Sequence, residues 1–229
     1  MILDKEVLRD RLDRLIWEIE EARIKRSEHL IVQLVVVSKY TESENIRTLY
    51  ELGQRAFGEN QVQQLEKRVN ELNDLPIAWH QIGTLQTNKI NKLIDLEPFL
   101  LQSLDSIKLA NELNKRLEKK DKTMDALLQI NSSYEESKSG VKPEEAVDIY
   151  QEIKERFNRI NLKGVMTIGA HSKDESKIRK SFERTYNIFE KLQKDGAKIC
   201  SMGMSGDFKI AIESGSNMVR IGSYLFREP

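Results

Sequence analysis

Eight short apolar segments, separated from one another by helix-like stretches, constrain the fold of this chain more than any other feature. The segment IVQLVVVS, residues 31–38, is nearly continuous in apolar and β-branched residues. Such runs are typical of strands that are buried on both faces. Strands that alternate with amphipathic stretches indicate parallel βαβ units, and a count of eight favours a closed (β/α)8 barrel of the TIM type. The alternative is an open, doubly wound sheet.

The expected strands cover residues 31–38, 56–57, 77–82, 98–103, 124–130, 162–168, 198–201 and 217–221. The expected helices cover 4–27, 41–52, 60–72, 87–95, 106–120, 143–157, 175–194 and 207–214. The first of these is an extra amphipathic N-terminal helix. Thr41 and Glu44 have the spacing of a capping box, and Pro143 suits a first helical position. No Pro-, Gly- or Ser-rich linker interrupts the pattern, so we expect residues 1–229 to form one domain.

The charge balance limits the classes of partner. The chain has 37 basic and 37 acidic residues and a formal net charge of zero, so it exerts no global attraction on nucleic acid or anionic membrane. Its first residues do not resemble a signal peptide, because charged residues recur every few positions. No stretch approaches the roughly 20 apolar residues that a membrane helix needs. One cysteine, Cys200, permits no intrachain disulfide, which fits a reducing compartment. We therefore expect a cytoplasmic protein that binds neither nucleic acid nor membrane, and a monomer or weak homodimer.

Lys39 directly follows the first expected strand, at the end of a barrel where sites form. Counting by two from Val35 and Val37 places Lys39 on the same face as these apolar side chains. If that face points inward, partial desolvation lowers the pKa of the amine, and the neutral amine can attack an aldehyde to form a Schiff base. The alternative is a lysine that extends from the strand end into solvent.

Two glycine-containing turns follow the seventh and eighth expected strands, where phosphate sites are frequent in these barrels. In the first turn, Gly203 permits close approach of the backbone to a ligand, and Ser205 can donate its hydroxyl. The following short helix offers free N–H groups at its start. Gly222 and Ser223 repeat the arrangement one strand later. The pair of turns predicts an anion site, although glycines also serve simply to turn a chain.

Arg220 lies between Val219 and Ile221 in the last expected strand, so alternation directs its side chain to the opposite face, into the barrel. A buried guanidinium needs an acceptor. That acceptor is either a carboxylate such as Glu59 or a bound ligand. The spacing of His80, beside Trp79, and of the other two histidines suggests no metal site.

Several sequence blocks together resemble one known family. They are VVVSKY, FGENQVQQ, WHQIGTLQTNK, NSSYEESKSG, GVMTIGA and SMGMSGDFKIAIESGSNMVRIGSYLF, which occur in order between about residues 31 and 226. These blocks resemble the pyridoxal phosphate homeostasis proteins, whose barrel is similar to the N-terminal domain of alanine racemase, a fold-type III pyridoxal 5′-phosphate (PLP) fold. Three places depart from the residues that are usual in the family blocks: Asn217, Thr84, and the end of the chain, where Arg227 follows Phe226 in place of the usual glycine.

The resemblance implies a role for individual residues. Lys39 would hold PLP as a covalent aldimine, Asn60 would lie beside the ring substituents, and Arg220 would face the pyridine nitrogen. The phosphate would be surrounded by two groups of residues: Met202, Gly203, Met204 and Ser205 in the first turn, and Gly222 and Ser223 in the second. His80 lies in a family block and is included as a cofactor-binding residue, with its role open. Lys138, in the block NSSYEESKSG, is expected to be a surface lysine.

These roles favour a non-enzymatic protein of intracellular PLP (vitamin B6) homeostasis, with PLP-dependent apoenzymes as recipients of the cofactor. PLP catalysis stores negative charge in a protonated pyridinium ring, and an arginine at the ring nitrogen leaves that nitrogen unprotonated. The six tyrosines include no evident second-face base of the kind that alanine racemase takes from another domain.

Two alternatives remain from the sequence. One is a small fold-type III PLP enzyme, such as an amino-acid racemase that uses a base from this chain or a partner subunit. The other is a Schiff-base enzyme of aldolase type without PLP, which leaves Arg220 and the two glycine turns unexplained.

Overall fold

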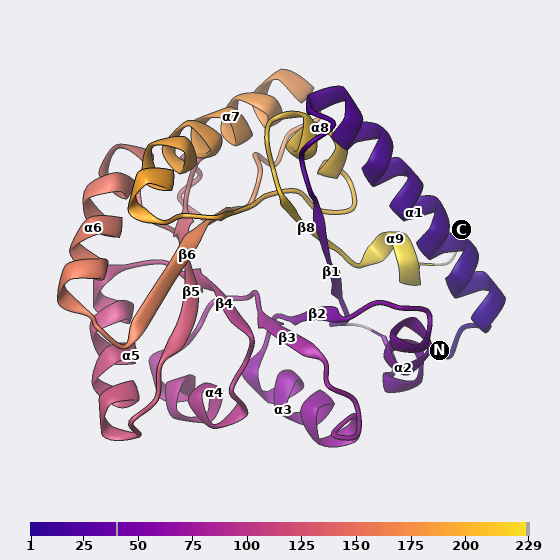
Figure 1. Ribbon diagram of the computed structural model, residues 1–229, viewed down its shortest axis with the longest axis horizontal. Helices are drawn as coiled ribbons and strands as arrows, with labels where there is room; N and C mark the ends of the chain where they lie inside the picture. Colours follow the sequence, from indigo (N-terminus) through magenta and orange to yellow (C-terminus); the bar gives the residue numbers. More distant parts are fainter. Residues whose placement is uncertain (40, 228–229) are drawn as a thin grey trace.

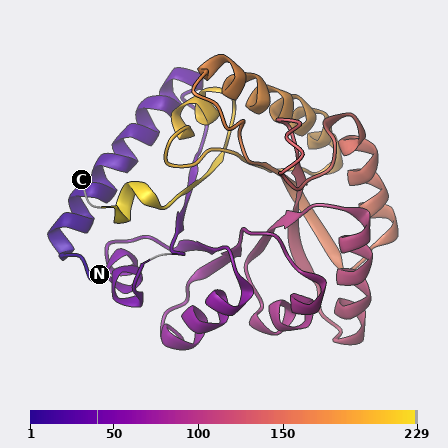
Figure 2. The same ribbon diagram turned by 180° about the vertical axis from the view of Figure 1, so that it is seen from behind.

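The strands close into a parallel barrel in chain order, with β1 paired to β8, in the computed structural model, which describes residues 1–39 and 41–227. The ring of helices around this barrel is visible from both sides (Figures 1 and 2). The strands are β1 (Gln33–Val37), β2 (Ala56–Glu59), β3 (Ala78–Gln81), β4 (Leu100–Leu104), β5 (Met124–Ile130), β6 (Ile160–Thr167), β7 (Ile199–Ser201) and β8 (Met218–Ile221). The predicted (β/α)8 barrel is confirmed, and the open sheet is wrong.

Helices follow the strands on the outside of the barrel. They are α1 (Lys5–Arg26), α2 (Ser43–Glu51), α3 (Val62–Glu71), α4 (Ile90–Leu96), α5 (Ile107–Lys119), α6 (Ala146–Arg156), α7 (Glu175–Leu192), α8 (Phe208–Glu213) and α9 (Ser223–Phe226). Short 3₁₀ turns, Thr87–Lys89, Pro143–Glu145 and Gln193–Asp195, adjoin α4, α6 and α7. Since α8 has only six residues, the long α1 covers the barrel beside it and also packs against α2 and α9 (Figure 1).

The buried face of α1 carries its apolar residues at helical spacing: Leu8, Leu12, Leu15, Ile19 and Ala22. Asp4 caps this helix by accepting a hydrogen bond from the N–H of Glu6, which satisfies one of the donors that a helix start leaves unpaired. The Tyr224 hydroxyl of α9 donates to Glu18, which ties the two ends of the chain together. The extra N-terminal helix is therefore an integral part of the outer layer.

Alternation within each strand separates two cores. In β1, Val36 belongs to the large apolar layer between strands and helices, whereas Val35 belongs to a small cluster inside the barrel. In β8, Val219 and Ile221 face the outer layer, and Met218 faces the interior. Successive side chains of a strand point to opposite faces, so one short sequence serves both layers.

Two local predictions differ from the structure. Thr41 and Glu44 do not form the predicted capping box: Glu42 is the N-cap of α2 without a side-chain bond, and the Thr41 hydroxyl accepts from the Asn45 amide. The short helix α9, directly after β8, is absent from the expected elements. Pro143 begins a 3₁₀ turn ahead of α6, as the restricted φ of proline favours.

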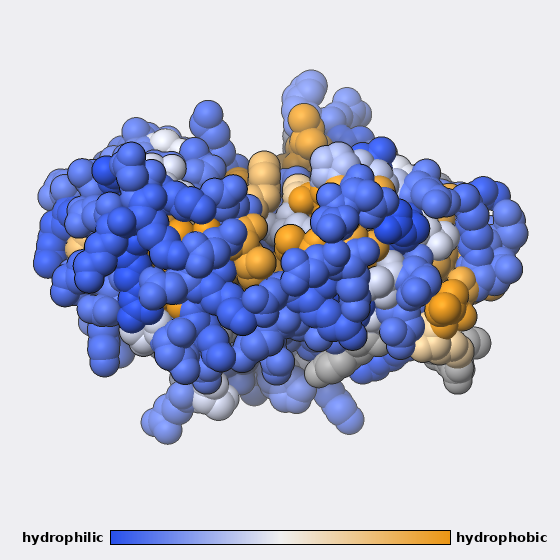
Figure 3. Space-filling view, turned by 90° about the horizontal axis from the view of Figure 1, so that it is seen from below, coloured by the Kyte–Doolittle hydropathy of each residue, from blue (hydrophilic) through white to orange (hydrophobic). Residues whose placement is uncertain are grey.

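Hydrophilic side chains cover most of the face shown in Figure 3, with apolar side chains exposed in small patches. Among residues 1–39 and 41–227, no helix is long and apolar enough to cross a membrane.

Candidate functional site

A cavity of about 550 Å³ opens where the strands end at their carboxyl termini. Residues that directly follow β1, β2, β3, β6, β7 and β8 all contribute to its wall. Seven of the ten predicted site residues line it: Lys39, Asn60, Met204, Ser205, Arg220, Gly222 and Ser223. Its other lining residues are Val37, Ile82, Gly83, Thr84, Gln129, Met166, Ile168, Gly206, Phe226 and Arg227. The two glycine turns and the strand-end lysine therefore meet at one place, as alternation and barrel closure predict.

Lys39 lies two residues beyond Val37, and both residues line the cavity. The inward face of β1 therefore leads to the lysine as predicted. The side chain of Lys39 is exposed, however, so the expected desolvation by an apolar wall is wrong. The lysine lies on the turn after the strand, where solvent reaches it. Tyr40, the next residue, lies outside the described residues.

Arg220 reaches the cavity from inside the barrel and is only 4% exposed. Its guanidinium donates to the Ser201 hydroxyl at 2.6 Å and to the Thr167 carbonyl at 2.8 Å. No acidic side chain in the described ranges forms an ion pair with it, so its hydrogen-bond partners there are neutral. Burial lowers the pKa of Arg220 to about 10 against the opposing charge of Asp207, and this pKa still leaves the group charged at neutral pH. A buried charge with neutral partners retains a strong electrostatic demand for an anion or an acceptor.

Glu59, the carboxylate considered from sequence as the partner of Arg220, has other partners. It accepts from the Ser38 hydroxyl at 2.8 Å, and one of its oxygens lies 3.7 Å from Nε of Arg68. Burial raises the pKa of Glu59 to about 7, against the opposing effects of Ser38 and Arg68. The Glu59–Arg220 pairing is wrong because Glu59 lies on the outer side of β2, facing α3, whereas Arg220 points inward.

The loop after β7 closes one wall of the cavity. Gly203 has a φ of +96°, and an added Cβ would lie 2.7 Å from the Cβ of Ala211. Asp207 accepts from the N–H of Met204 at 2.6 Å, which shapes the loop between them. The N–H groups of Ser205, Gly206 and Ser223 make no hydrogen bond to the residues that the structure describes. Such free donors beside a cavity are suited to an anion.

The loop after β8 completes this wall. A Cβ added at Gly222 would lie 2.6 Å from the carbonyl oxygen of Val37, so a larger residue would push the loop away from β1. The Ser205 hydroxyl accepts from the N–H of Tyr224 at 3.3 Å, which joins the two turns. The predicted double turn is therefore one connected structure.

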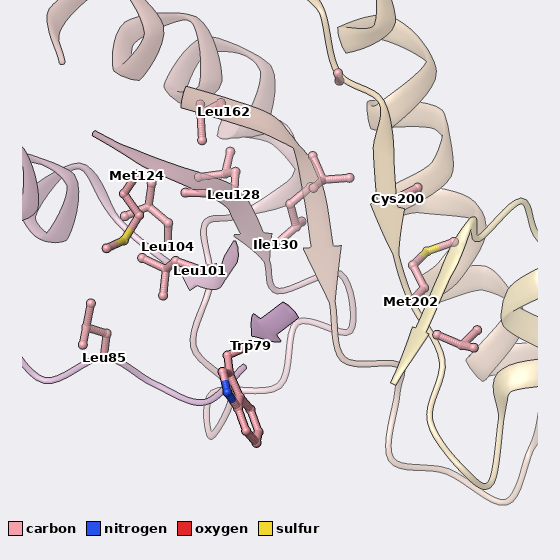
Figure 4. Close-up of a cluster of buried hydrophobic side chains, with 14 of the residues drawn as sticks. Trp79, Leu85, Leu101, Leu104, Met124, Leu128, Ile130, Leu162, Cys200 and Met202 are labelled. Carbon is pink, nitrogen blue, oxygen red and sulfur yellow. The ribbon is translucent and has the colours of Figure 1, made fainter. Parts of the chain in front are cut away.

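Met202, Gly203 and His80, the other three predicted site residues, do not line the cavity. Met202 is fully buried in the apolar layer between strands and helices, near Cys200, as Figure 4 shows. Gly203 packs against α8, and its carbonyl accepts from the N–H of Arg220. The placement of Met202 and Gly203 supports the loop from behind. Cys200 is buried, as its apolar surroundings predict.

His80 lies inside the barrel, fully buried, where its Nδ1 is 2.9 Å from Nε2 of Gln102. Burial lowers the pKa of His80 to about 4, so the ring is neutral at physiological pH. The hydroxyl of Ser201 donates to Oε1 of the same Gln102 at 2.7 Å. Sequence reasoning missed Gln102, Ser201 and Asp207. The period-two alternation of LLQSL and ICS was the signal that directs Gln102 and Ser201 inward.

Lys138 differs from the predicted surface lysine. Its side chain is 15% exposed, and Nζ donates to the Gly169 carbonyl at 2.6 Å and contacts Glu135 at 2.8 Å. These bonds join the loop after β5 to the loop after β6. Thr84 lines the cavity, whereas the Asn217 side chain bonds to the backbone of Cys200 and Lys198. Of the departures from the family blocks, Thr84 therefore adjoins the site, and so do Phe226 and Arg227.

Comparison with known proteins identifies relatives that share this architecture. Residues 18–228 match the family described as alanine racemase, N-terminal domain. The chain is 53% identical over 220 residues to a protein of Helicobacter pylori named pyridoxal phosphate homeostasis protein, and the match covers 96% of this chain and 98% of the relative.

Solved structures agree on the fold. The structure of PipY of Synechococcus elongatus with PLP bound is 27% identical, has a TM-score of 0.82, and is matched over 96% of this chain and 100% of PipY. Alanine racemase of Clostridium difficile is 18% identical with a TM-score of 0.75, and the match covers 95% of this chain and 60% of the racemase. The similarity to alanine racemase supports the fold alone. From its barrel, its cavity and these relatives, the chain belongs to the pyridoxal phosphate homeostasis protein family, which has the fold of the alanine racemase N-terminal domain.

Proposed function

We propose that this protein binds PLP in the cavity at the carboxyl end of the barrel, through a covalent bond to Lys39, and acts in PLP homeostasis as a carrier. The observation that carries the proposal is Arg220. Its charge is buried at the wall of a cavity that also exposes Lys39, and its hydrogen-bond partners in the described residues are neutral. A ligand with a ring nitrogen and an anionic group would give Arg220 a further hydrogen-bond acceptor and would bring a negative charge into the cavity.

The residues fit PLP at several points. Lys39 supplies the primary amine that condenses with an aldehyde. The free N–H groups of Ser205, Gly206 and Ser223, with the two serine hydroxyls, would hold the phosphate between the two turns. Gly203 and Gly222 stand where a Cβ would displace these loops. Asn60 would lie beside the ring substituents, as its place in the cavity wall allows.

Carriage is favoured over catalysis by the electrostatics of Arg220. When bound, PLP supplies an electron-accepting ring, which works best with a protonated ring nitrogen. A guanidinium that keeps its proton donates to that nitrogen and does not protonate it. The ionisable side chains that line the described part of the cavity are Lys39, Arg220 and Arg227, all of them basic. This set suits retention of an anion more than the removal of a proton from a substrate.

The test is a visible absorption spectrum of the purified protein with added PLP, before and after borohydride reduction, followed by mapping of the modified peptide. We expect a PLP-dependent band and a reduced adduct on Lys39. Lys39→Ala should abolish the adduct, whereas the exposed helical control Lys108→Ala should retain it. A colourless protein that does not take up PLP would sink the proposal.

The enzymatic alternative is tested by incubation of the PLP-loaded protein with amino acids in heavy water. We expect little exchange of the α-proton. Rapid exchange that is lost in Lys39→Ala would favour a racemase-type enzyme. We further propose that the protein is a single domain, cytoplasmic, a monomer or weak homodimer, and that PLP-dependent apoenzymes receive its cofactor. Gel filtration and transfer to a defined apoenzyme test the last two points.

A further inference from the structure

A row of hydrogen bonds crosses the barrel interior from Arg220 to His80. The guanidinium of Arg220 on β8 contacts the Ser201 hydroxyl on β7 at 2.6 Å. Ser201 contacts Oε1 of Gln102 on β4 at 2.7 Å, and Nε2 of Gln102 contacts Nδ1 of His80 on β3 at 2.9 Å. Ser201, Gln102 and His80 are fully buried. None of these three lines the cavity, and the proposed function assigns them no part.

The direction of every bond in this row follows from its first member. Arginine can only donate, so the Ser201 oxygen accepts from Arg220 and its single proton must donate onward. The acceptor of that proton is the carbonyl oxygen of the Gln102 amide. This fixes the orientation of the amide, so its N–H₂ group faces His80 and Met218, with Nε2 at 3.4 Å from the sulfur of Met218.

The direction also determines the tautomer of His80. Since Nε2 of Gln102 donates, Nδ1 of His80 must accept and carries no proton. The ring proton is then on Nε2, which is buried and has no partner among the described residues. Protonation of Nδ1 would place its N–H against the N–H₂ group of Gln102, so the row of hydrogen bonds requires a neutral ring. The burial of His80 also favours the neutral ring. The whole row is therefore a one-way chain of donors that ends at His80.

We propose that Ser201 and Gln102 are positioning residues, which hold the Arg220 guanidinium in the orientation that receives the pyridine nitrogen of PLP. This inference rests on the proposed function. Of the donors of Arg220, one points to Ser201 and another to the Thr167 carbonyl, and these two bonds on separate strands restrict rotation of the planar group. Gln102 keeps a lone pair of Ser201 turned toward Arg220, because its Oε1 accepts the hydrogen bond from the Ser201 hydroxyl and so directs that proton away from the guanidinium.

The first experiment uses the wild-type protein labelled with ¹⁵N-histidine and needs no PLP. The chain contains three histidines, so the resonances of His80 can be assigned with a His80→Phe variant. We expect His80 to be neutral, with its ring proton on Nε2, in this protein, where Ser201 and Gln102 are both present. A proton on Nδ1 would overturn the directed chain, whether or not the protein binds PLP.

The second experiment measures Arg220 through the bound cofactor, with PLP that is ¹⁵N-labelled at the ring nitrogen. In the wild type we expect an unprotonated ring nitrogen that accepts a hydrogen bond. Ser201→Ala and Gln102→Leu should weaken PLP binding about tenfold and allow this nitrogen to take up a proton in mildly acidic buffer. Ser201→Thr, which keeps the hydroxyl, should restore the wild-type signal.

The matched control is Ser181→Ala, which removes a buried hydroxyl of α7 that bonds to the Ile178 carbonyl and the N–H of Ala170. It should change neither the affinity nor the ring-nitrogen resonance. If PLP binds normally and both Ser201→Ala and Gln102→Leu retain the wild-type ring-nitrogen signal, the positioning role is wrong and the proposed function stands. If no PLP binds to the wild type, the proposed function fails, and the tautomer of His80 alone decides whether the directed chain exists.

Discussion

Arg68 and Arg220 are buried to the same extent, each 4% exposed, yet their charges are balanced in opposite ways. Arg68, on α3 outside the barrel, lies 3.7 Å from Glu59 and 3.3 Å from Glu71, and it donates to the Ser43 hydroxyl and the Thr41 carbonyl. Arg220, inside the barrel, has the Ser201 hydroxyl and the Thr167 carbonyl.

The difference supports our proposal that Arg68 serves the fold and that Arg220 serves a ligand. Arg68 receives its counter-charges from the chain itself and ties the Lys39-bearing turn to α3 through Thr41. Arg220 is oriented by two neutral hydrogen-bond partners, and the charge of Asp207 stabilises its protonated form without a direct ion pair. Burial alone, which is equal at the two sites, predicts neither role. The following predictions test this division from the largest expected effect to the smallest.

Replacement of Arg68 should affect the fold most. Arg68→Met leaves Glu59 buried without its cation, so we expect the free energy of unfolding to fall by about 3 kcal/mol or more. Urea denaturation of the protein without PLP measures this. The control is Arg47→Met, which removes the exposed Arg47–Asp74 pair and should have little effect. A stable Arg68→Met variant would mean that the Glu59 pair does not serve the fold.

The pH dependence of stability should reveal Glu59 and His80 as opposing groups. The folded pKa of Glu59 is raised from 4.5 to about 7 by burial, so its contribution to stability is lost as pH rises through this window. The folded pKa of His80 is lowered from 6.5 to about 4, so stability is lost as pH falls from 6.5 to 4. The two effects oppose each other over most of this range, and each corresponds to about 3 kcal/mol at most.

We expect the wild type to show a shallow profile in urea denaturation across this window, and Glu59→Gln to show stability that rises with pH. Glu71→Gln is the control, since Glu71 contacts Arg68 from an exposed position. An identical profile in Glu59→Gln and the wild type would contradict the raised pKa of Glu59.

Replacement of Arg220 should affect the ligand and spare the fold. In Arg220→Met, an apolar side chain of similar length replaces a charge that forms no direct ion pair among the described residues, so the free energy of unfolding should change by no more than about 1 kcal/mol. PLP affinity should fall roughly tenfold to a hundredfold, with a shift of the visible band, because one hydrogen bond to a charged group is lost. Titration with PLP and denaturation of the same sample measure both. Global unfolding of this variant would assign Arg220 to the fold, as for Arg68.

Removal of the Ser205 hydroxyl should give the smallest of these effects. Ser205→Ala should weaken PLP retention about tenfold through loss of one phosphate hydrogen bond, with unchanged unfolding in urea. Dialysis of the loaded protein measures retention. Ser214→Ala, which removes a hydroxyl that bonds to the Ile210 carbonyl of α8, is the control. Equal retention in Ser205→Ala and the wild type would place the phosphate elsewhere.

Much of the architecture was predictable because it depends on short-range patterns. The eight strands follow from apolar runs, and the inward direction of Arg220 follows from its place between Val219 and Ile221. The same alternation placed Lys39 on the face of Val37, and both residues line the cavity. The capping box at Thr41 failed because its hydroxyl instead pairs with Asn45, which the spacing of residues does not reveal.

The residues that we propose to position Arg220 could not be found from the sequence. Ser201 and Gln102 lie 99 positions apart and meet only because the barrel closes and brings β4 and β7 to opposite sides of one interior. Likewise, Glu59 pairs with Arg68 because both face the layer between β2 and α3, although its position near the rim suggested Arg220.

The sequence by itself determined the strands, their inward faces and the presence of an amine, a guanidinium and two glycine turns at one end of the barrel. Local periodicity carries that information, since each strand alternates independently of its neighbours. Tertiary structure alone decided which buried arginine forms an ion pair within the chain. That outcome depends on the register and curvature with which eight strands close, and these set the distances between side chains that no local pattern relates.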